Sequence, residues 1–453
     1  MSKGLQVGYS KANINPHMGI RITGYYQIRR AEGVLDDLET VAIAINHGEK
    51  TMVWITVDNC GLGKDVFKRY RETLAEKVGL PIEAICVQAT HTHTGPALRA
   101  VDFATEEDNK NIAEYIDFVE KRLVDVAKLA IADLKPAKMG YGIGQAPNVA
   151  FIRRYRMKDG SVRTNPGVNN PDIVAPIGQV DERVTVLRFD REGATSVILV
   201  NFANHPDTVG GSLISGDWPS MTRRMVEKCL DNTSCIMLNG AEGDVNHVNV
   251  HPTKGDFNDM FNDFDGCSRG YGHTRYIARV ITAGVLQAFD KVNYVDVDGI
   301  NYVQKVVDIP ANVPDPKDMP LARKYNDLHN AGRDDEIPFK AMMLTTVVAE
   351  AARMVRLEHG PESFPFLLSA MSIGNVALIG IPGEPFNAIG KALKETEGWD
   401  LVIPCCYTNS AEGYFPMQDS YEEGGYEARG SNFKAGVGEK IIAFGQDLLK
   451  DLK

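Results

Sequence analysis

The sequence predicts an α/β fold: a mixed or largely parallel central sheet with helices on both faces, a three-layer sandwich, with inserted loops and a small helical lobe. Two patterns indicate it. Apolar, β-branched runs alternate along the chain with segments of helical spacing, which is typical of strand–helix–strand units. Several apolar runs also end in small residues followed by a polar or ionisable one, as strands do when they deliver side chains to one edge of a sheet.

The first strand–helix–strand unit is expected between residues 51 and 90. The run "TMVWITVDN" at 51–59 is apolar and β-branched, and "KDVFKRYRETLAEKVG" at 64–79 has helical spacing with Gly79 as its stop. The run "AICVQAT" at 84–90 is apolar again. Strands of the same kind are expected within residues 195–207, 234–247, 375–386 and 401–415.

Residues 308–365 depart from this rhythm. They begin with the Pro-rich run "DIPANVPDPKDMP" and continue with helical composition. We expect a small helical lobe here, inserted before the strand at 375–386, within a single domain that spans residues 1–453. No internal repeat or low-complexity tract is present along the chain.

Composition narrows the function classes. Lys and Arg total 49 against 60 Asp and Glu, a net charge of −11, and no basic cluster stands out. This argues against nucleic acid and anionic membrane surfaces as partners. The first residues lack the apolar core of a leader peptide, and no uninterrupted apolar stretch approaches the roughly 18 to 20 residues of a membrane span. We expect a cytoplasmic protein without integral membrane association that acts on a small-molecule substrate; the sequence indicates no oligomeric state.

Polar and ionisable side chains gather just past the predicted strand ends, in a set that is rich in metal ligands: His91 and His93, His205, Asp244 with His247, Glu384, and Tyr414. His91 and His93 are two residues apart, so in an extended chain both imidazoles point the same way. Loops that follow the carboxyl ends of strands converge in α/β sheets. Imidazoles with one carboxylate are the usual ligands of a catalytic zinc that leaves a position open for water.

Short motifs along residues 7–428 resemble the catalytic domain of the neutral/alkaline non-lysosomal ceramidases, zinc amidohydrolases that cleave the N-acyl bond of ceramide. In the family's order they are "VGYSKANINP", "GVLDDLETVAIAI", "ATHTHTGP", "NFANHPDTV", "GDV" at 243–245, "IPGEPF" and "GYFPMQDSYEEGGYEA". Their order along the chain makes the combination more specific than any one of them.

The resemblance implies a site with one zinc ion per chain. Its ligands would be His91, His205, Glu384 and Tyr414. Beside the metal, His93 and Tyr426 would contact or polarise the substrate carbonyl. The family also has an arginine in the site, and the "NVAFIRRYR" segment offers Arg153 or Arg154; local spacing does not decide between them.

The sequence departs from the family pattern in one place that bears on chemistry. Asn246 and His247 follow "GDV", where ceramidases have Ser-Pro. A serine nucleophile at that position is excluded, whereas attack by a metal-activated water is not. The chain also stops at residue 453, soon after the last motif, so we expect the family's C-terminal immunoglobulin-like domain to be missing and the substrate to be polar or modest in size rather than ceramide itself.

The sequence therefore predicts a zinc-dependent hydrolase that cleaves an amide (N-acyl) or related linkage by metal-activated water. One alternative is a two-metal phosphoesterase-like hydrolase, because "HTH", "NHPD" and "GDVNH" echo ligand motifs of that class, although in a different order. Another is a non-catalytic metal- or ligand-binding homologue, if Asn246 marks lost activity. His247 and His251, next to the acidic stretch at 255–266, leave open a second metal.

Overall fold

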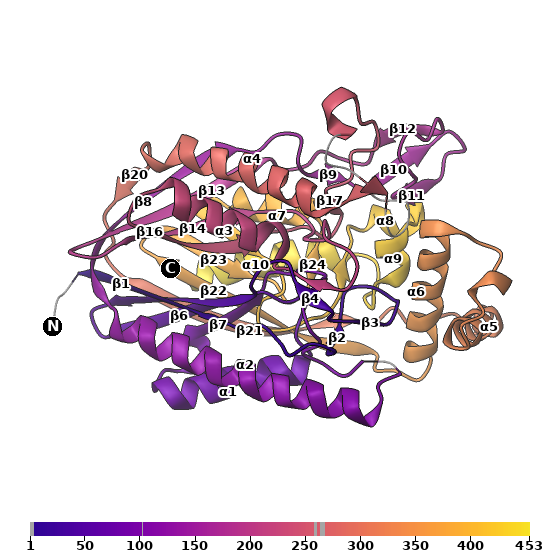
Figure 1. The fold of residues 1–453 in the computed structure, drawn as a ribbon, viewed down its shortest axis with the longest axis horizontal. Coiled ribbons are helices and arrows are strands. Elements are labelled where there is room, and N and C mark those ends of the chain that lie inside the picture. Colours follow the sequence, from indigo (N-terminus) through magenta and orange to yellow (C-terminus); the bar gives the residue numbers. More distant parts are fainter. Residues whose placement is uncertain (1–3, 102, 258–260, 263–267) are drawn as a thin grey trace.

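The computed structural model of the protein describes residues 4–101, 103–257, 261–262 and 268–453 (Figure 1). Its largest sheet has nine strands, in the order β16 (Thr233–Asn239), β14 (Ser196–Phe202), β13 (Arg183–Arg191), β8 (Lys135–Gln145), β1 (Leu5–Asn13), β5 (Glu39–His47), β6 (Lys50–Val57) and β7 (Ile85–Ala89), with β20 (Asn293–Val295) also pairing with β8. A second sheet has four strands, in the order β21 (Ile300–Pro310), β22 (Ser363–Ile373), β23 (Val376–Gly380) and β25 (Leu401–Cys405).

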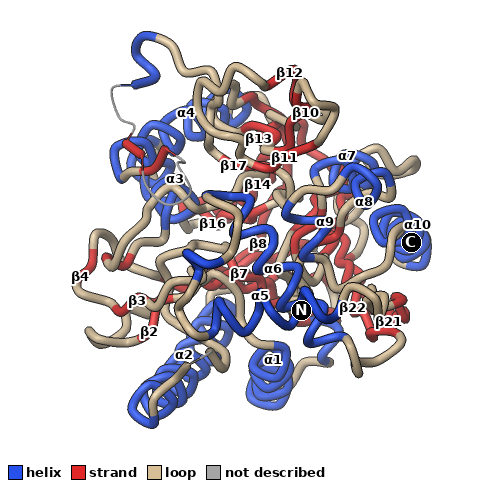
Figure 2. Tube along the Cα trace, turned by 90° about the vertical axis from the view of Figure 1, so that its right-hand side faces the viewer, coloured by secondary structure: helices blue, strands red, loops and turns tan. Residues whose placement is uncertain are grey.

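The two sheets pack face to face. Their inner faces form one buried apolar cluster, to which the large sheet contributes Ile43, Trp54 and Leu199 and the second sheet Met371 and Leu378. Helices cover the outer faces: α1 (Lys64–Val78), α2 (Glu106–Ala132), α3 (Asp217–Cys229) and α4 (Tyr271–Phe289) over the large sheet, α7 (Asn387–Lys394) and α10 (Val437–Asp451) over the second. Figure 2 shows these helices around a centre of strands. The molecule therefore has four layers.

The predicted α/β class with a large mixed sheet is confirmed. The layering differs from the predicted three layers, because a second sheet, rather than helices, covers the inner face of the nine-stranded sheet. The periodicity of apolar residues does not distinguish a sheet covered by helices from a sheet covered by another sheet. A strand buried on both faces reads as a continuous apolar run whether its neighbour is a helix or another sheet.

The first predicted unit is present with nearly the expected boundaries. Residues 51–59 lie in β6 and its following loop, the helix expected at 64–79 is α1, and the strand expected at 84–90 is β7. α1 ends before Gly79, which has φ 70° and donates its backbone N–H to the carbonyl of Ala75. Glycine adopts this left-handed conformation without a Cβ clash, which explains why the helix stops there.

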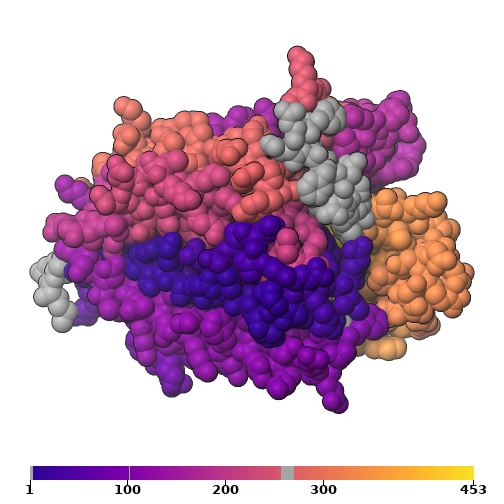
Figure 3. Space-filling model, viewed as in Figure 1, coloured from indigo at the N-terminus to yellow at the C-terminus, as the bar shows by residue number. Residues whose placement is uncertain are grey.

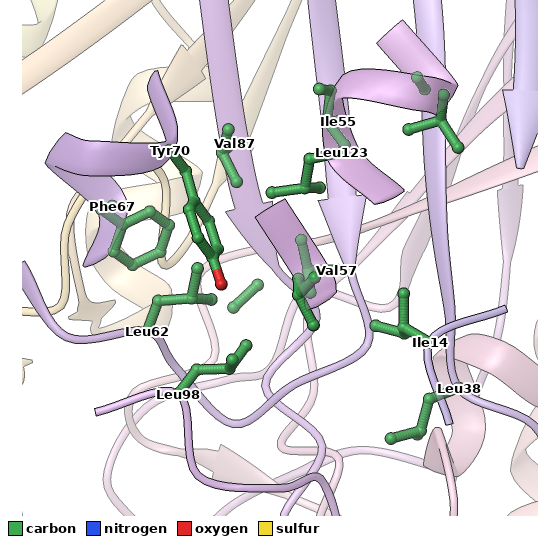
Figure 4. Close-up of a cluster of buried hydrophobic side chains, with 14 of the residues drawn as sticks. Ile14, Leu38, Ile55, Val57, Leu62, Phe67, Tyr70, Val87, Leu98 and Leu123 are labelled. Carbon is green, nitrogen blue, oxygen red and sulfur yellow. The ribbon is translucent and has the colours of Figure 1, made fainter. Parts of the chain in front are cut away.

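The outer face of the large sheet shows what holds α1 and α2 in place. Ile55 and Val87 point from β6 and β7 toward the helices, and Phe67 and Tyr70 of α1 and Leu123 of α2 cover them (Figure 4). All five side chains are fully buried. Full burial of a large apolar side chain contributes about 1.5–3 kcal/mol, so this cluster fixes the helices against the sheet.

Parallel strand pairs interrupt the mostly antiparallel sheets at three places: β6 with β7, β14 with β16, and β23 with β25. The carboxyl ends of these pairs meet. Gln88 Nε2 donates to the carbonyl of Asn239 at 2.8 Å, which joins the end of β7 to the end of β16. Asn201 Nδ2 donates to the carbonyl of Pro404 at 3.1 Å, which joins β14 to β25. The loops that leave these strands therefore open into one shared region.

The segment expected to form a helical lobe, residues 308–365, contains α5 (Met319–Asn330) and α6 (Ala341–Leu357), between the paired strands β21 and β22. In Figure 3 this segment, coloured orange, stands at one end of the molecule. α6 packs against α9 (Tyr426–Gly430). Among the described helices, none is both long enough and apolar enough to cross a membrane.

Candidate metal centre

The loop after β7 turns sharply at His91. This residue has φ 75°, a left-handed conformation that is uncommon for a residue other than glycine. Its backbone N–H donates to the carbonyl of Asn59 at 2.8 Å, and its side chain is buried. Backbone strain of this kind persists where the surrounding structure enforces it, often at functional sites. The left-handed conformation of His91 directs its imidazole toward the ends of β14 and β16.

His91 and His205 are oriented in the same way, through their Nδ1 atoms. His91 Nδ1 hydrogen-bonds the carbonyl of Cys60, and His205 Nδ1 hydrogen-bonds the carbonyls of Glu242 at 2.9 Å and Val245 at 3.0 Å. A carbonyl only accepts, so both rings carry their proton on Nδ1 when neutral, and both Nε2 lone pairs face the centre. This is the arrangement by which proteins fix a metal-binding histidine. Burial lowers the pKa of His205, which favours the neutral ring that a metal requires.

Glu384 completes this group from β24 (Glu384–Pro385), a short strand that follows β23 of the second sheet. Its Oε1 accepts a hydrogen bond of 2.6 Å from the Tyr407 hydroxyl. Its buried Oε2 has no hydrogen-bond donor among the described residues, and lies 3.1 Å from His205 Nε2 and 3.6 Å from His91 Nε2. Burial raises the pKa of Glu384, but attraction to His91 and His205 outweighs it and lowers the pKa below its usual range. The carboxylate is therefore ionised.

These distances suit a zinc ion. Zinc bonds of about 2.0–2.2 Å in a tetrahedron place ligand atoms roughly 3.3–3.6 Å apart. The separation of Glu384 Oε2 from His91 Nε2, 3.6 Å, lies in this range, and that from His205 Nε2, 3.1 Å, is slightly shorter. Three acceptor atoms that face one another without a donor also need a cation or a proton between them. Two imidazoles and a carboxylate are ligand types that zinc accepts. The residues present thus fit the metal that the sequence predicts.

A second carboxylate, Glu242, lies in the same centre and was not among the residues chosen from the sequence. Donor atoms of His91, His205, Glu242 and Glu384 all lie within 4.8 Å of one another. The sequence did contain a signal, because Glu242 is the first ionisable residue after β16. Asp244, which the same pattern predicts as a site residue, instead accepts the backbone N–H of Asn387 at 2.7 Å.

Tyr414 lies against the other side of His205. The two rings are stacked, with centroids 6.5 Å apart and planes inclined by 18°. The ring of Tyr426 meets Tyr414 edge-on at 5.5 Å, and its hydroxyl lies 3.1 Å from the hydroxyl of Tyr26. Burial raises the pKa of Tyr414 well above its usual value, and the positive charge of Arg153 offsets this only in part, so this phenol is neutral unless a metal ion binds it.

Arg153 and Arg154 point to different places, because neighbouring residues in extended chain face opposite sides. The Arg153 guanidinium lies 5.5 Å from the centre of the Tyr414 ring and is held by Glu427 Oε1 at 2.6 Å. Arg154 Nη1 instead donates to Ser420 Oγ at 2.8 Å. Arg153 is thus the arginine that borders the centre, while Arg154 supports a neighbouring loop.

His93 lies at the exposed side of the centre. Its Nε2 is 3.2 Å from His91 Nε2, and its Nδ1 is 3.4 Å from Asp207 Oδ1. The Tyr25 hydroxyl donates to the same Asp207 oxygen. Asp207 and Tyr25 were also missed from the sequence, where nothing marks them as neighbours of His93. A carboxylate behind an imidazole fixes its orientation and stabilises its protonated form.

The remaining sequence candidates lie outside this group. His247 is buried with its ring 5.7 Å from that of His273, and His251 is exposed. Much of the acidic stretch at 255–266 lies outside the described residues. The side chain of Asn246 stabilises the surrounding loops: its Oδ1 accepts the Val248 N–H at 3.0 Å and its Nδ2 donates to Asn165 at 2.9 Å.

Fold and site together define an α/β protein with a buried histidine–carboxylate centre suited to a divalent metal. The chain is similar in structure to the neutral ceramidase from Pseudomonas aeruginosa, with a TM-score of 0.71 and 17% sequence identity over 99% of this chain and 74% of that chain. It is similarly close to a ceramidase complexed with C2, with a TM-score of 0.71 and 18% identity over 99% of this chain and 76% of that chain. No protein-family model and no curated protein sequence matches the chain. The resemblance expected from the motifs is confirmed at the level of the fold.

Proposed function

We propose that the protein is a zinc-dependent hydrolase that cleaves an amide (N-acyl) or related linkage with water. The observation that carries this proposal is the convergence of three buried acceptor atoms, from His91, His205 and Glu384, at distances suited to one zinc ion. The fold shared with neutral ceramidase supports the amide class. One zinc ion per chain is proposed, held by these three residues and Tyr414.

The ion would supply Lewis acidity and lower the pKa of a bound water from 15.7 to about 7. The chain's own residues then have separate tasks. His93 presents Nε2 to the centre while Asp207 lies behind its Nδ1, so His93 is the proposed group that takes a proton from water and gives it to the leaving amine. Tyr426 and Arg153 lie beside Tyr414, where a hydroxyl donor and a positive charge would stabilise the developing oxyanion.

The surroundings of the centre favour a polar substrate. The hydroxyl of Tyr26 meets that of Tyr426 at an exposed position, and the ring of Tyr26 lies edge-on to His329 of α5, at 6.2 Å between centroids. These groups offer hydrogen bonds and flat ring faces to a substrate. We therefore propose a polar or small N-acyl substrate rather than ceramide.

A metal assay combined with a substrate panel tests the proposal. Wild type is compared with His91→Ala and Glu384→Ala by elemental analysis, and His359→Ala serves as the control because His359 is exposed. Each protein is then assayed with short N-acyl amino acids, the matching esters and phosphate monoesters. We expect about one zinc per chain in wild type and in the control, most of it lost in the two site variants, and hydrolysis of the amides only where zinc is retained.

Other outcomes point to the alternatives. A wild type that neither contains zinc nor takes it up would overturn the metal hydrolase and favour a non-catalytic role for the fold. Zinc-dependent hydrolysis confined to the phosphate esters would favour a phosphoesterase. That alternative has less support, because the two groups of side chains among the described residues that could hold a metal ion share His91 and do not form two separate sites.

A further inference from the structure

Glu242 is a buried carboxylate without a matching donor. Its side chain is 0% exposed, and in the described part of the chain the only donors near its oxygens are its own backbone N–H and the Cys406 thiol. The Cys406 thiol lies beside it, but a thiol is a weak donor and does not replace the hydration that the carboxylate gives up. Leaving such a group buried and unpaired is costly, so the site must supply either a cation or a proton.

The position of Glu242 is fixed by its backbone. Its carbonyl accepts hydrogen bonds from His205 Nδ1 at 2.9 Å and from the Val245 N–H at 2.8 Å. The next residue, Gly243, donates its N–H to the Pro385 carbonyl at 2.8 Å, and a Cβ at Gly243 would lie 2.4 Å from the Glu384 carbonyl oxygen. The loop is therefore packed tightly against the Glu384 loop, and its carboxylate cannot turn out to solvent.

The four donor atoms contributed by His91, His205, Glu242 and Glu384 lie within 4.8 Å of one another. Metal–ligand bonds of about 2.0–2.2 Å span donor atoms up to roughly 4.4 Å apart across one ion. The upper limit on the separations of the four donors is therefore within a few tenths of an ångström of the longest separation between two ligands of one ion. Glu242 then contributes to metal binding in two ways, because its backbone carbonyl orients His205 and its side-chain carboxylate reaches the centre.

We propose that Glu242 is a further metal ligand of this centre, so that two carboxylates, two imidazoles and the Tyr414 phenol surround one divalent ion. This inference rests on the metal centre of the proposed function. Two carboxylates balance the double positive charge of the ion, which strengthens metal binding and moderates the Lewis acidity of the ion compared with a single-carboxylate site.

Metal binding by Glu242→Gln tests the inference without any assay of catalysis. Metal-free wild type and variant are titrated with Zn²⁺ against a chromophoric chelator and with Co²⁺ by visible absorption. We expect the zinc Kd of the variant to rise at least about 10- to 100-fold, the loss typical even of residues that only support a ligand. We also expect a changed Co²⁺ spectrum, because one oxygen donor is lost. Glu242→Ala is measured in parallel, since a glutamine carbonyl could still bind weakly.

Thermal unfolding adds a second readout that a purely structural role would not produce. Without metal, Glu242→Gln should melt at the same temperature as wild type or higher, because it replaces a buried carboxyl that lacks a strong donor with a neutral amide of the same size. With saturating Zn²⁺, the rise in Tm should be smaller for the variant than for wild type. Asp244→Asn is the matched control: Asp244 is buried on the same loop, and asparagine can still accept the Asn387 N–H.

The results separate the inference from the proposed function. If wild type binds Zn²⁺ while Glu242→Gln and Glu242→Ala bind it with the same Kd and give the same Co²⁺ spectrum, Glu242 is a protonated buried acid and the inference is wrong, although the zinc hydrolase stands. If wild type binds no metal, both are wrong. If metal binding falls as expected but no amide is hydrolysed, the inference holds and only the proposed reaction fails.

Discussion

At the scale of single residues, each metal-binding side chain is held by a partner behind it. Carbonyl groups orient the two imidazoles, and the Tyr407 hydroxyl holds Glu384 at 2.6 Å. The ring of Tyr407 also stacks on His91, with centroids 4.4 Å apart and an angle of 18°. One tyrosine thus fixes the positions of two proposed ligands, although nothing in its own chemistry marks it as functional.

Substitution of Tyr407 by phenylalanine should weaken metal binding and leave the fold intact. The variant keeps the ring that stacks on His91 but leaves Glu384 free to rotate. We expect the zinc Kd to rise about 10- to 100-fold, measured by chelator competition, with little change in far-UV circular dichroism. Tyr421→Phe is the control, because the Tyr421 hydroxyl donates to the Phe433 carbonyl, at 2.6 Å, away from the centre. An equal effect of both substitutions would contradict the assigned role.

At the scale of elements, Asp181 ties the two sheets together near the site. It stands before β13 of the large sheet, where Arg183 Nε donates to it at 2.7 Å. Lys394 of α7, on the outer face of the second sheet, donates to it at 3.0 Å. Burial raises the pKa of Asp181, but the hydrogen bonds and attraction from Arg183 and Lys394 outweigh it and lower the pKa to about 2.

This lowered pKa predicts a pH-dependent stability. A carboxyl whose pKa is lower in the folded than in the unfolded state stabilises the fold above its unfolded pKa of about 3.9 and loses that contribution as the pH falls toward 2. Asp181→Asn should therefore lower the free energy of unfolding by about 2 kcal/mol at pH 7, since one pKa unit corresponds to about 1.4 kcal/mol. The difference from wild type should shrink between pH 4 and pH 2.

Urea unfolding at several pH values measures this difference. Asp290→Asn is the control, because the Asp290 side chain is 83% exposed and its nearest guanidinium nitrogen, on Arg188, is 3.8 Å away. We expect that change to stay within about 0.5 kcal/mol at every pH. A loss for Asp181→Asn that is constant from pH 7 down to pH 2 would show that the ion pairs with Arg183 and Lys394 are not its source.

At the scale of the whole molecule, the site exists because the large sheet curves until its far edges meet. β7 and β16 lie at opposite ends of the strand order, yet Asn239 Nδ2 at the end of β16 donates to the Thr90 carbonyl just past β7, at 3.2 Å. Arg223 of α3, the helix on the outer face of the large sheet, links residues at the ends of two of its strands. It is fully buried and donates to Asp58 at 2.9 Å, just past β6, and to Glu39 at 2.8 Å, where β5 begins.

Replacement of Arg223 by methionine should destabilise the entire fold. The change leaves Asp58, which is fully buried, without its counter-charge, and removal of one partner of a buried ion pair costs about 3–5 kcal/mol. Denaturant unfolding measures the loss, and Arg223→Met combined with Asp58→Asn should recover part of it. Arg122→Met, at an exposed pair on α2, should cost less than about 1 kcal/mol. A loss for Arg223→Met as small as that of Arg122→Met would refute the argument.

The sequence by itself determined the local elements and the positions at which they end. The β6–α1–β7 unit was predictable because apolar period, β-branched content and a helix-stopping glycine are properties of neighbouring residues. His91, His205 and Glu384 could be predicted as site residues because each lies just past an apolar run that predicts a strand. Their convergence around one point was expected from a general property of α/β sheets, and the structure brings them together.

Tertiary structure alone decided which partners these elements take. A second sheet stands where a layer of helices was expected. The sequence of an apolar strand does not indicate whether a helix or another sheet covers it. Arg153 rather than Arg154 borders the centre, and Glu242 rather than Asp244 enters it, although each pair is nearly adjacent along the chain. The orientation of a strand or loop decides which of two nearby side chains faces the metal centre. That orientation depends on packing between residues more than a hundred positions apart along the chain, rather than on the conformational preferences of the residues themselves.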